Sequence, residues 1–136
     1  MHPVTRQEAE SGMEEHHDVN MRLNVPVPMY DGVKLSADLY LPRASGPFPT
    51  VLIRTPYSNN IPDMIRKGRA LANRGYACVI QDTRGRWDSQ GEYNPFFDEA
   101  RDGFETQEWI GHQTWSNGKV GMSGASYVAA VQWLSA

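Results

Sequence analysis

Two short apolar runs, separated by one helical stretch, constrain the fold of this chain most strongly. The runs cover Thr50–Arg54 and Tyr76–Gln81, and neither alternates apolar with polar residues as a half-buried strand does. Between them, Pro62 begins a stretch with apolar residues at helical spacing, and Gly75 follows its end. A strand, a helix and a second buried strand form a right-handed βαβ unit. The sequence therefore predicts an α/β fold with parallel strands.

Further elements on both sides extend this unit. Residues 23–29 and 33–39 flank an Asp-Gly pair and predict a β-hairpin. A helix is expected over Asp98–Ile110, and a strand over Lys119–Ser123 leads into a sharp turn and a last helix. In an open parallel sheet, functional sites form at the carboxyl ends of the strands. Three loops are expected there: Thr55–Asn59, Asp82–Trp87 and Gly124–Tyr127.

Composition excludes several classes of partner. The 136 residues carry a net charge of −3 with both signs interspersed, which argues against nucleic acid and anionic membranes as partners. No leader-like segment and no run of about 18 apolar residues occurs, so a cytoplasmic protein is expected. Residues 1–20 are polar and acidic and predict a flexible arm, whereas residues 21–136 predict part of one catalytic domain.

The cysteine and histidine content gives no sign of a metal site. Cys78 is the only cysteine and lies in an apolar run, which predicts a buried, unreactive thiol and a reducing compartment. His16 and His17 are adjacent in the polar arm but have no third ligand nearby, so we expect no metal.

Ser126 lies at the sharp turn that follows the last strand. Gly124 and Ala125 precede it, and small residues are required where a chain bends tightly to expose a nucleophilic hydroxyl. Val128 takes the place of the second glycine in the Gly-x-Ser-x-Gly pattern, so Ser126 as an ordinary helix N-cap stays open at this point. A dinucleotide-binding turn needs further glycines where Val128 and Ala129 stand, and no cofactor is expected.

Four sequence blocks, taken together, resemble one branch of the α/β-hydrolases. This family includes cocaine esterase, α-amino-acid ester hydrolases and X-prolyl dipeptidyl peptidases, and the likeness extends from Val25 to Ala136. The family usually has Gly-x-Ser-Tyr-x-Gly, so Ala129 departs from the pattern with another small residue. The four blocks are Val27–Leu35 with Asp38–Tyr40, Arg54–Tyr57, Gln81–Gly85 with Ser89–Gly91, and Gly118–Tyr127.

The resemblance implies a serine hydrolase that acts on small esters, amides or X-Pro dipeptides. Ser126 would be the acylated nucleophile, and the backbone N–H of Tyr127 would be one donor of the oxyanion hole. The phenol of Tyr57 would be the second donor. Without the resemblance, Tyr57 would be read as a packing aromatic residue.

Other polar residues near the strand ends receive structural roles. Asp82 and Arg84 are expected to form ion pairs that support the fold rather than catalysis. His112 precedes Ser126, whereas the family's catalytic histidine follows both the serine and the acid, so His112 is expected at the surface.

The ten residues after Ser126 contain neither an acid nor a histidine to complete a triad. We therefore expect the chain to be the amino-terminal part of an α/β-hydrolase fold and inactive alone. The alternative is a truncated or degenerate, non-catalytic hydrolase-like binding protein. Removing the neighbour of the Lys119–Ser123 strand would expose its edge, which predicts self-association.

Overall fold

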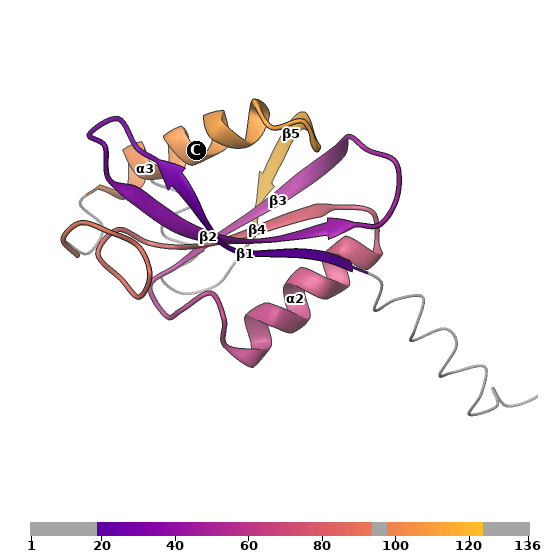
Figure 1. Cartoon of the computed structure of the whole chain (residues 1–136), viewed down its shortest axis with the longest axis horizontal. Coiled ribbons are helices and arrows are strands. Elements are labelled where there is room, and N and C mark those ends of the chain that lie inside the picture. Colours follow the sequence, from indigo (N-terminus) through magenta and orange to yellow (C-terminus); the bar gives the residue numbers. More distant parts are fainter. Residues whose placement is uncertain (1–18, 94–97, 124–136) are drawn as a thin grey trace, which may run out of the picture.

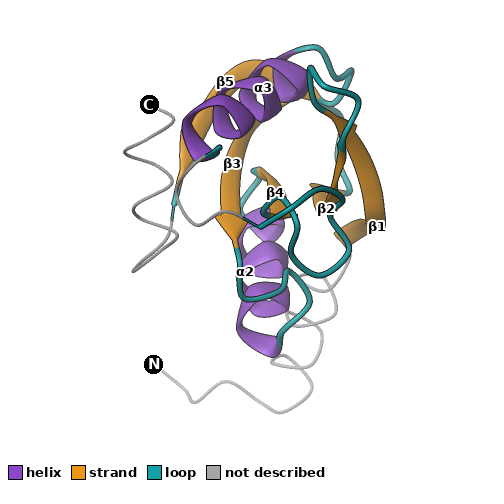
Figure 2. Ribbon diagram, turned by 90° about the vertical axis from the view of Figure 1, so that its left-hand side faces the viewer, coloured by secondary structure: helices purple, strands orange, loops and turns teal. Residues whose placement is uncertain are grey.

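The computed structural model describes residues 19–93 and 98–123, which form a mixed sheet with one helix on each face (Figures 1 and 2). The strand order is β1-β2-β4-β3-β5. The pairs β1–β2 and β2–β4 are antiparallel, whereas β4–β3 and β3–β5 are parallel. The predicted α/β class, hairpin and βαβ unit are therefore confirmed. The elements are β1 (Val19–Pro28), β2 (Lys34–Pro42), β3 (Phe48–Thr55), α2 (Pro62–Asn73), β4 (Ala77–Asp82), α3 (Glu99–Gly111) and β5 (Ser116–Met122).

Three strands begin earlier than the apolar pattern indicates. β1 begins at Val19, which pairs with Pro42, rather than at Leu23. β3 begins at Phe48, whose N–H donates to the carbonyl of Trp115, and β5 begins three residues before Lys119. Partner strands fix these boundaries, because a polar residue at an exposed position still completes the backbone hydrogen bonds of the sheet.

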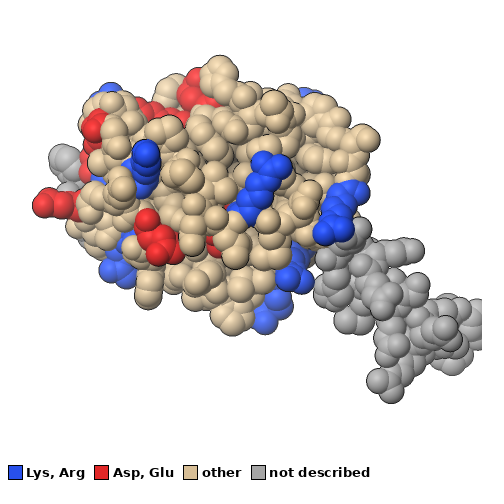
Figure 3. All heavy atoms as spheres, in the orientation of Figure 1, with Lys and Arg blue, Asp and Glu red and all other residues tan. Residues whose placement is uncertain are grey.

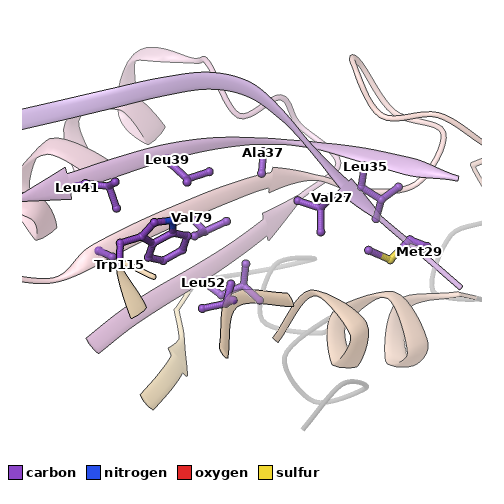
Figure 4. Close-up of a cluster of buried hydrophobic side chains, with 11 residues drawn as sticks. Val27, Met29, Leu35, Ala37, Leu39, Leu41, Leu52, Val79 and Trp115 are labelled. Carbon is purple, nitrogen blue, oxygen red and sulfur yellow. The ribbon is translucent and has the colours of Figure 1, made fainter. Parts of the chain in front are cut away.

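The face of the sheet that α3 covers, the α3 face, carries the larger apolar core (Figure 4). Alternate residues of β2 point to this face, including Leu35 and Leu39. Trp115 closes the core at one end, where its ring meets Trp109 of α3 edge to face at 6.2 Å between centroids. The remaining buried members are Val27, Met29, Ala37, Leu41, Leu52, Ala77, Val79 and Ile110.

On the opposite face, the α2 face, the helix approaches the sheet closely at one point. Tyr40 of β2 is fully buried and its ring lies against Gly68 of α2. A Cβ atom at Gly68 would lie 2.4 Å from the Tyr40 ring, so only glycine allows the helix to approach this closely. Cys78 is buried beside Ile80 in the same cluster, as the sequence predicted.

Charged side chains of both signs are scattered over the face of the molecule seen in Figure 3. No helix among the described residues is long and apolar enough to cross a membrane. His112 is exposed just after the end of α3, as expected.

Candidate active site

Two of the three predicted loops meet at the carboxyl ends of the parallel strands. The N–H of Thr83 donates to the carbonyl of Thr55 (3.1 Å), and the N–H of Asn59 donates to Oδ1 of Asp82 (2.8 Å). The Asn59 side chain adds a bond from Nδ2 to the carbonyl of Ile80 (3.2 Å). These bonds hold the β3–α2 loop against β4 and the segment that follows it.

The third loop, which contains Ser126 and Tyr127, lies outside the described residues. β5 runs parallel to β3, and the N–H of Ser123 donates to the carbonyl of Leu52 (3.2 Å). The last described residue therefore lies beside β3. The roles predicted for Ser126 and Tyr127 stay predictions.

Tyr57 lies on the β3–α2 loop, with half of its surface exposed (50%). Its N–H donates to Oγ1 of Thr55 (3.0 Å). The preceding carbonyl, that of Pro56, accepts two hydrogen bonds from the neighbouring loop: one from Nε of Arg86 (3.0 Å) and one from Nε1 of Trp87 (2.9 Å). The backbone on the amino side of Tyr57 is thus held at both its donor and its acceptor.

Two non-glycine residues of these loops adopt left-handed backbone angles. Ser58 has a φ of 86° and Trp87 has a φ of 51°. Such conformations cost on the order of 1–3 kcal/mol each and persist only where the surroundings impose them. Here one strained residue lies on each side of the contact between the two loops.

Asp82 is fully buried at the end of β4. The prediction that it forms an ion pair was wrong. Among the described residues no cation pairs with it. Its carboxylate instead accepts hydrogen bonds from the backbone N–H groups of Asn59 and, at 3.4 Å, Asp88. Burial raises the pKa of Asp82 to about 6, against the smaller, opposing effect of these two bonds. The sequence shows the charge but not that the loop backbone would turn its N–H groups toward it.

Arg84, two residues further on, forms the ion pairs that were expected. Its Nε and Nη2 donate to the two oxygens of Asp102 in α3, both at 2.8 Å, and its Nη1 donates to Asp31 at 2.8 Å. The hydrogen bonds that Arg84 donates to these carboxylates raise its pKa, and the guanidinium lowers the pKa of Asp31. Arg84 thus connects the hairpin turn, the β4–α3 loop and α3.

A second buried arginine was not anticipated from the sequence. Arg54 of β3 is fully buried, and its Nη1 lies 2.5 Å from a carboxylate oxygen of Glu99 in α3. Its Nε donates to Oε1 of Gln81 (2.7 Å), which also accepts from the hydroxyl of Thr106 (3.0 Å). An arginine directly after the apolar residues of a buried run was the available signal, because a buried charge requires a partner.

The described residues bring together no group of three or more His, Cys, Asp or Glu side chains that could hold a metal ion. At the strand ends, Tyr57 lies half exposed on a hydrogen-bonded loop of β3, the neighbour of β5.

Comparison with known proteins identifies this arrangement. Residues 31–136 match the family of X-Pro dipeptidyl-peptidases (S15 family). Cocaine esterase from a Rhodococcus species is 44% identical over 124 residues, which cover 83% of this chain and 20% of the relative. A putative serine esterase of Mycobacterium tuberculosis is 35% identical over 127 residues, again covering 20% of the relative.

Solved structures agree. A CocE/NonD family hydrolase from Staphylococcus aureus superimposes with a TM-score of 0.76 at 28% identity, over 86% of this chain and 25% of that one. An α-amino acid ester hydrolase gives a TM-score of 0.75 at 31% identity, over 98% and 24%. This chain thus spans about a fifth to a quarter of the length of these relatives. It belongs to the X-Pro dipeptidyl-peptidase (S15) family of esterases and peptidases, and its sheet is part of an α/β-hydrolase fold.

Proposed function

We propose that this chain supplies the amino-terminal part of a serine hydrolase that cleaves ester or amide bonds, X-Pro dipeptide bonds included, through an acyl-enzyme at Ser126. The observation that carries the proposal is the placement of Tyr57. Tyr57, with half of its surface exposed, lies on a loop fixed by hydrogen bonds at the end of β3, and β5, the neighbour of β3, leads toward Ser126. The family match covers both residues.

In this mechanism the Ser126 hydroxyl attacks the carbonyl carbon of the substrate while a histidine takes its proton. The carbonyl oxygen becomes an oxyanion, which accepts hydrogen bonds from the Tyr57 phenol and the Tyr127 backbone N–H. The tetrahedral intermediate expels the alcohol or amine, which receives the proton from the histidine. Water then attacks the acyl-serine by the same route and releases the acid. We propose that the histidine and its acid come from sequence after Ala136.

The nucleophile can be tested by covalent labelling of the full-length hydrolase that carries this sequence. An organophosphonate should modify Ser126, and Ser126→Ala should abolish both labelling and turnover. Ser123→Ala is a matched control, because Ser123 lies three residues away and contributes a backbone N–H to the sheet, which alanine retains. Labelling of another serine with Ser126 unmodified would refute the assignment.

The oxyanion role of Tyr57 can be tested separately. Tyr57→Phe removes only the hydroxyl and should lower kcat by roughly 10²- to 10³-fold, the usual loss for one oxyanion donor. Tyr76→Phe is the matched control, since Tyr76 is also exposed (41%) but precedes β4 at the opposite end of the sheet. An unchanged kcat in Tyr57→Phe would return Tyr57 to the packing aromatics.

The proposal also covers the 136-residue chain expressed by itself. β5 is the outer strand of the described sheet, and an unpaired strand edge promotes association between chains. We propose that the isolated chain self-associates and does not hydrolyse p-nitrophenyl esters at enzymatic rates. Analytical ultracentrifugation and an ester assay with Ser126→Ala as control test this. A concentration-independent, inactive monomer with cooperative melting would instead favour the non-catalytic binding protein.

A further inference from the structure

The peptide group between Pro56 and Tyr57 is held from three sides. Its oxygen accepts from Arg86 and Trp87, and its N–H donates to Oγ1 of Thr55. Two residues later the backbone is fixed again, where the N–H of Asn59 meets the carboxylate of Asp82. Tyr57 is thus the side chain carried between two fixed points of the loop.

The stability of the fold alone does not explain the hydrogen bond from Trp87 to the Pro56 carbonyl. Trp87 is 62% exposed as a residue, so burial alone does not require a protein partner for its indole N–H. Its backbone is strained, with a φ of 51°. An exposed tryptophan with a strained backbone contributes little to the stability of the fold. Its hydrogen bond to the Pro56 carbonyl, in contrast, fixes the residue before Tyr57.

Arg86 lies against the indole ring and donates to the same carbonyl. Its guanidinium lies 5.7 Å from the Trp87 ring centroid and 5.0 Å from the Tyr93 ring centroid, while Nε donates to the same Pro56 carbonyl. The two donors therefore converge on one oxygen, and the aromatic contacts fix the direction from which they approach.

We propose that Trp87 is a positioning residue that orients the Tyr57 phenol toward the carbonyl oxygen of the substrate. This inference rests on the proposed oxyanion role of Tyr57 and deepens it. The donor of an oxyanion hole acts only if it is already aimed at the site where negative charge develops. The indole N–H of Trp87 fixes the Pro56–Tyr57 peptide plane and so limits the directions that the phenol samples before substrate binds.

The kinetic test is a double-mutant cycle in the full-length hydrolase. Trp87→Phe keeps an aromatic ring next to Arg86 but removes the N–H donor, and it should lower kcat about tenfold with little change in KM. In the Tyr57→Phe background the same substitution should have no further effect on kcat. Trp109→Phe, in the core against Trp115, is the control and should leave kcat unchanged in both backgrounds. An equal loss of kcat from Trp87→Phe in both backgrounds would overturn the inference.

A second readout does not depend on catalysis. With 3-fluorotyrosine placed only at position 57, the wild-type protein should give one narrow ¹⁹F resonance, and Trp87→Phe should broaden or split it. An unchanged resonance in Trp87→Phe would overturn the positioning role. If Tyr57→Phe leaves kcat unchanged, the oxyanion proposal fails by itself, and the ¹⁹F spectrum still decides whether Trp87 orients Tyr57.

Discussion

Buried carboxylates on the two faces of the sheet accept hydrogen bonds from different kinds of donor. On the α3 face, Glu99 and Asp102 each accept hydrogen bonds from an arginine, Arg54 and Arg84 respectively. On the α2 face, Asp38 and Asp82 are equally buried, but in the described part of the chain they receive backbone N–H groups and no cation.

This difference separates two roles for buried charge. The paired carboxylates link α3 to β3 and to the β4–α3 loop, so they fix the position of that helix. Burial raises the pKa of both Asp38 and Asp82, because backbone donors offset only part of the lost hydration. Asp82 accepts a hydrogen bond from the backbone of Asn59, so the loop that carries the proposed catalytic phenol is fixed by a carboxylate with a raised pKa rather than by an ion pair.

The largest expected effect comes from removing one partner of a buried ion pair. Arg54→Met should lower the free energy of unfolding by about 3–5 kcal/mol, because it removes the buried cation that pairs with the carboxylate of Glu99. Urea unfolding measures the loss. Adding Glu99→Leu to Arg54→Met should restore much of the stability, since the double variant removes both charges of the buried pair.

Arg66→Met is the matched control for this prediction. Arg66 also pairs with a carboxylate, that of Asp63, but both side chains are largely exposed (72% and 76%). Its removal should hardly change stability, because water replaces the lost interaction. Similar losses from Arg54→Met and Arg66→Met would show that burial does not set the strength of the α3-face pairs.

The next effect is a pH dependence due to Asp82. Its pKa is raised in the folded protein to about 6, from 3.8, so the folded state binds the proton more tightly than the unfolded state. Relative to Asp82→Asn, the wild type should therefore gain stability as pH falls from 7 to 4, by on the order of 2 kcal/mol. Urea unfolding of both proteins across this range measures the gain, and a pH-independent difference would contradict it.

Asp31 provides the opposite case. Arg84 lowers its pKa, so its contribution to stability is present above the ordinary value of 3.8 and is lost as pH falls through the lower, folded value. Asp31→Asn should therefore reduce stability at neutral pH and change the pH dependence only below about pH 4, the ordinary range for an aspartate. If stability changes with pH in opposite directions for Asp31→Asn and Asp82→Asn, the two pKa shifts have different causes: cation pairing for Asp31 and desolvation for Asp82.

A smaller change in stability is expected from substitutions at the contacts between each helix and the sheet. Gly68→Ala places a methyl group against the Tyr40 ring and should destabilise the protein by about 1–2 kcal/mol, less the gain in helix propensity. Gly111→Ala at the end of α3 meets no atom within 4 Å and should be neutral or slightly stabilising. Thermal melting compares the two, and equal effects would mean that α2 can move away from Tyr40.

The contrast between the faces also marks what the sequence could predict. Local chemistry set the bounds of α2, because Pro62 fits the first helical turn and Gly75 adopts the positive φ (93°) that follows the helix. The contact of Arg54 with Glu99 joins residues 45 positions apart, and no local pattern encodes such a pair. The strand-end loops were located by topology alone.

For Asp82 the same limit led to a wrong prediction. A buried carboxylate requires donors, but whether these are a cation or backbone N–H groups depends on how the Asn59 loop folds back. The family resemblance named Tyr57, whereas its hydrogen-bonded surroundings, including Trp87, became visible only in the structure.

Cys78, in the core of the α2 face, should have very low reactivity. Burial raises the pKa of this thiol to about 12, so at pH 8 roughly 10⁻⁴ of it is thiolate, the reactive form. Because Cys78 is the only cysteine, Ellman's reagent should modify the native protein at least about 10³-fold more slowly than the urea-unfolded protein. Ser45→Cys in a Cys78→Ser background gives an exposed reference thiol. Gly68→Ala should accelerate the reaction of Cys78 if the close contact of α2 with Tyr40 is what excludes the reagent, and fast, stoichiometric labelling of the wild type would show that the α2 face opens readily.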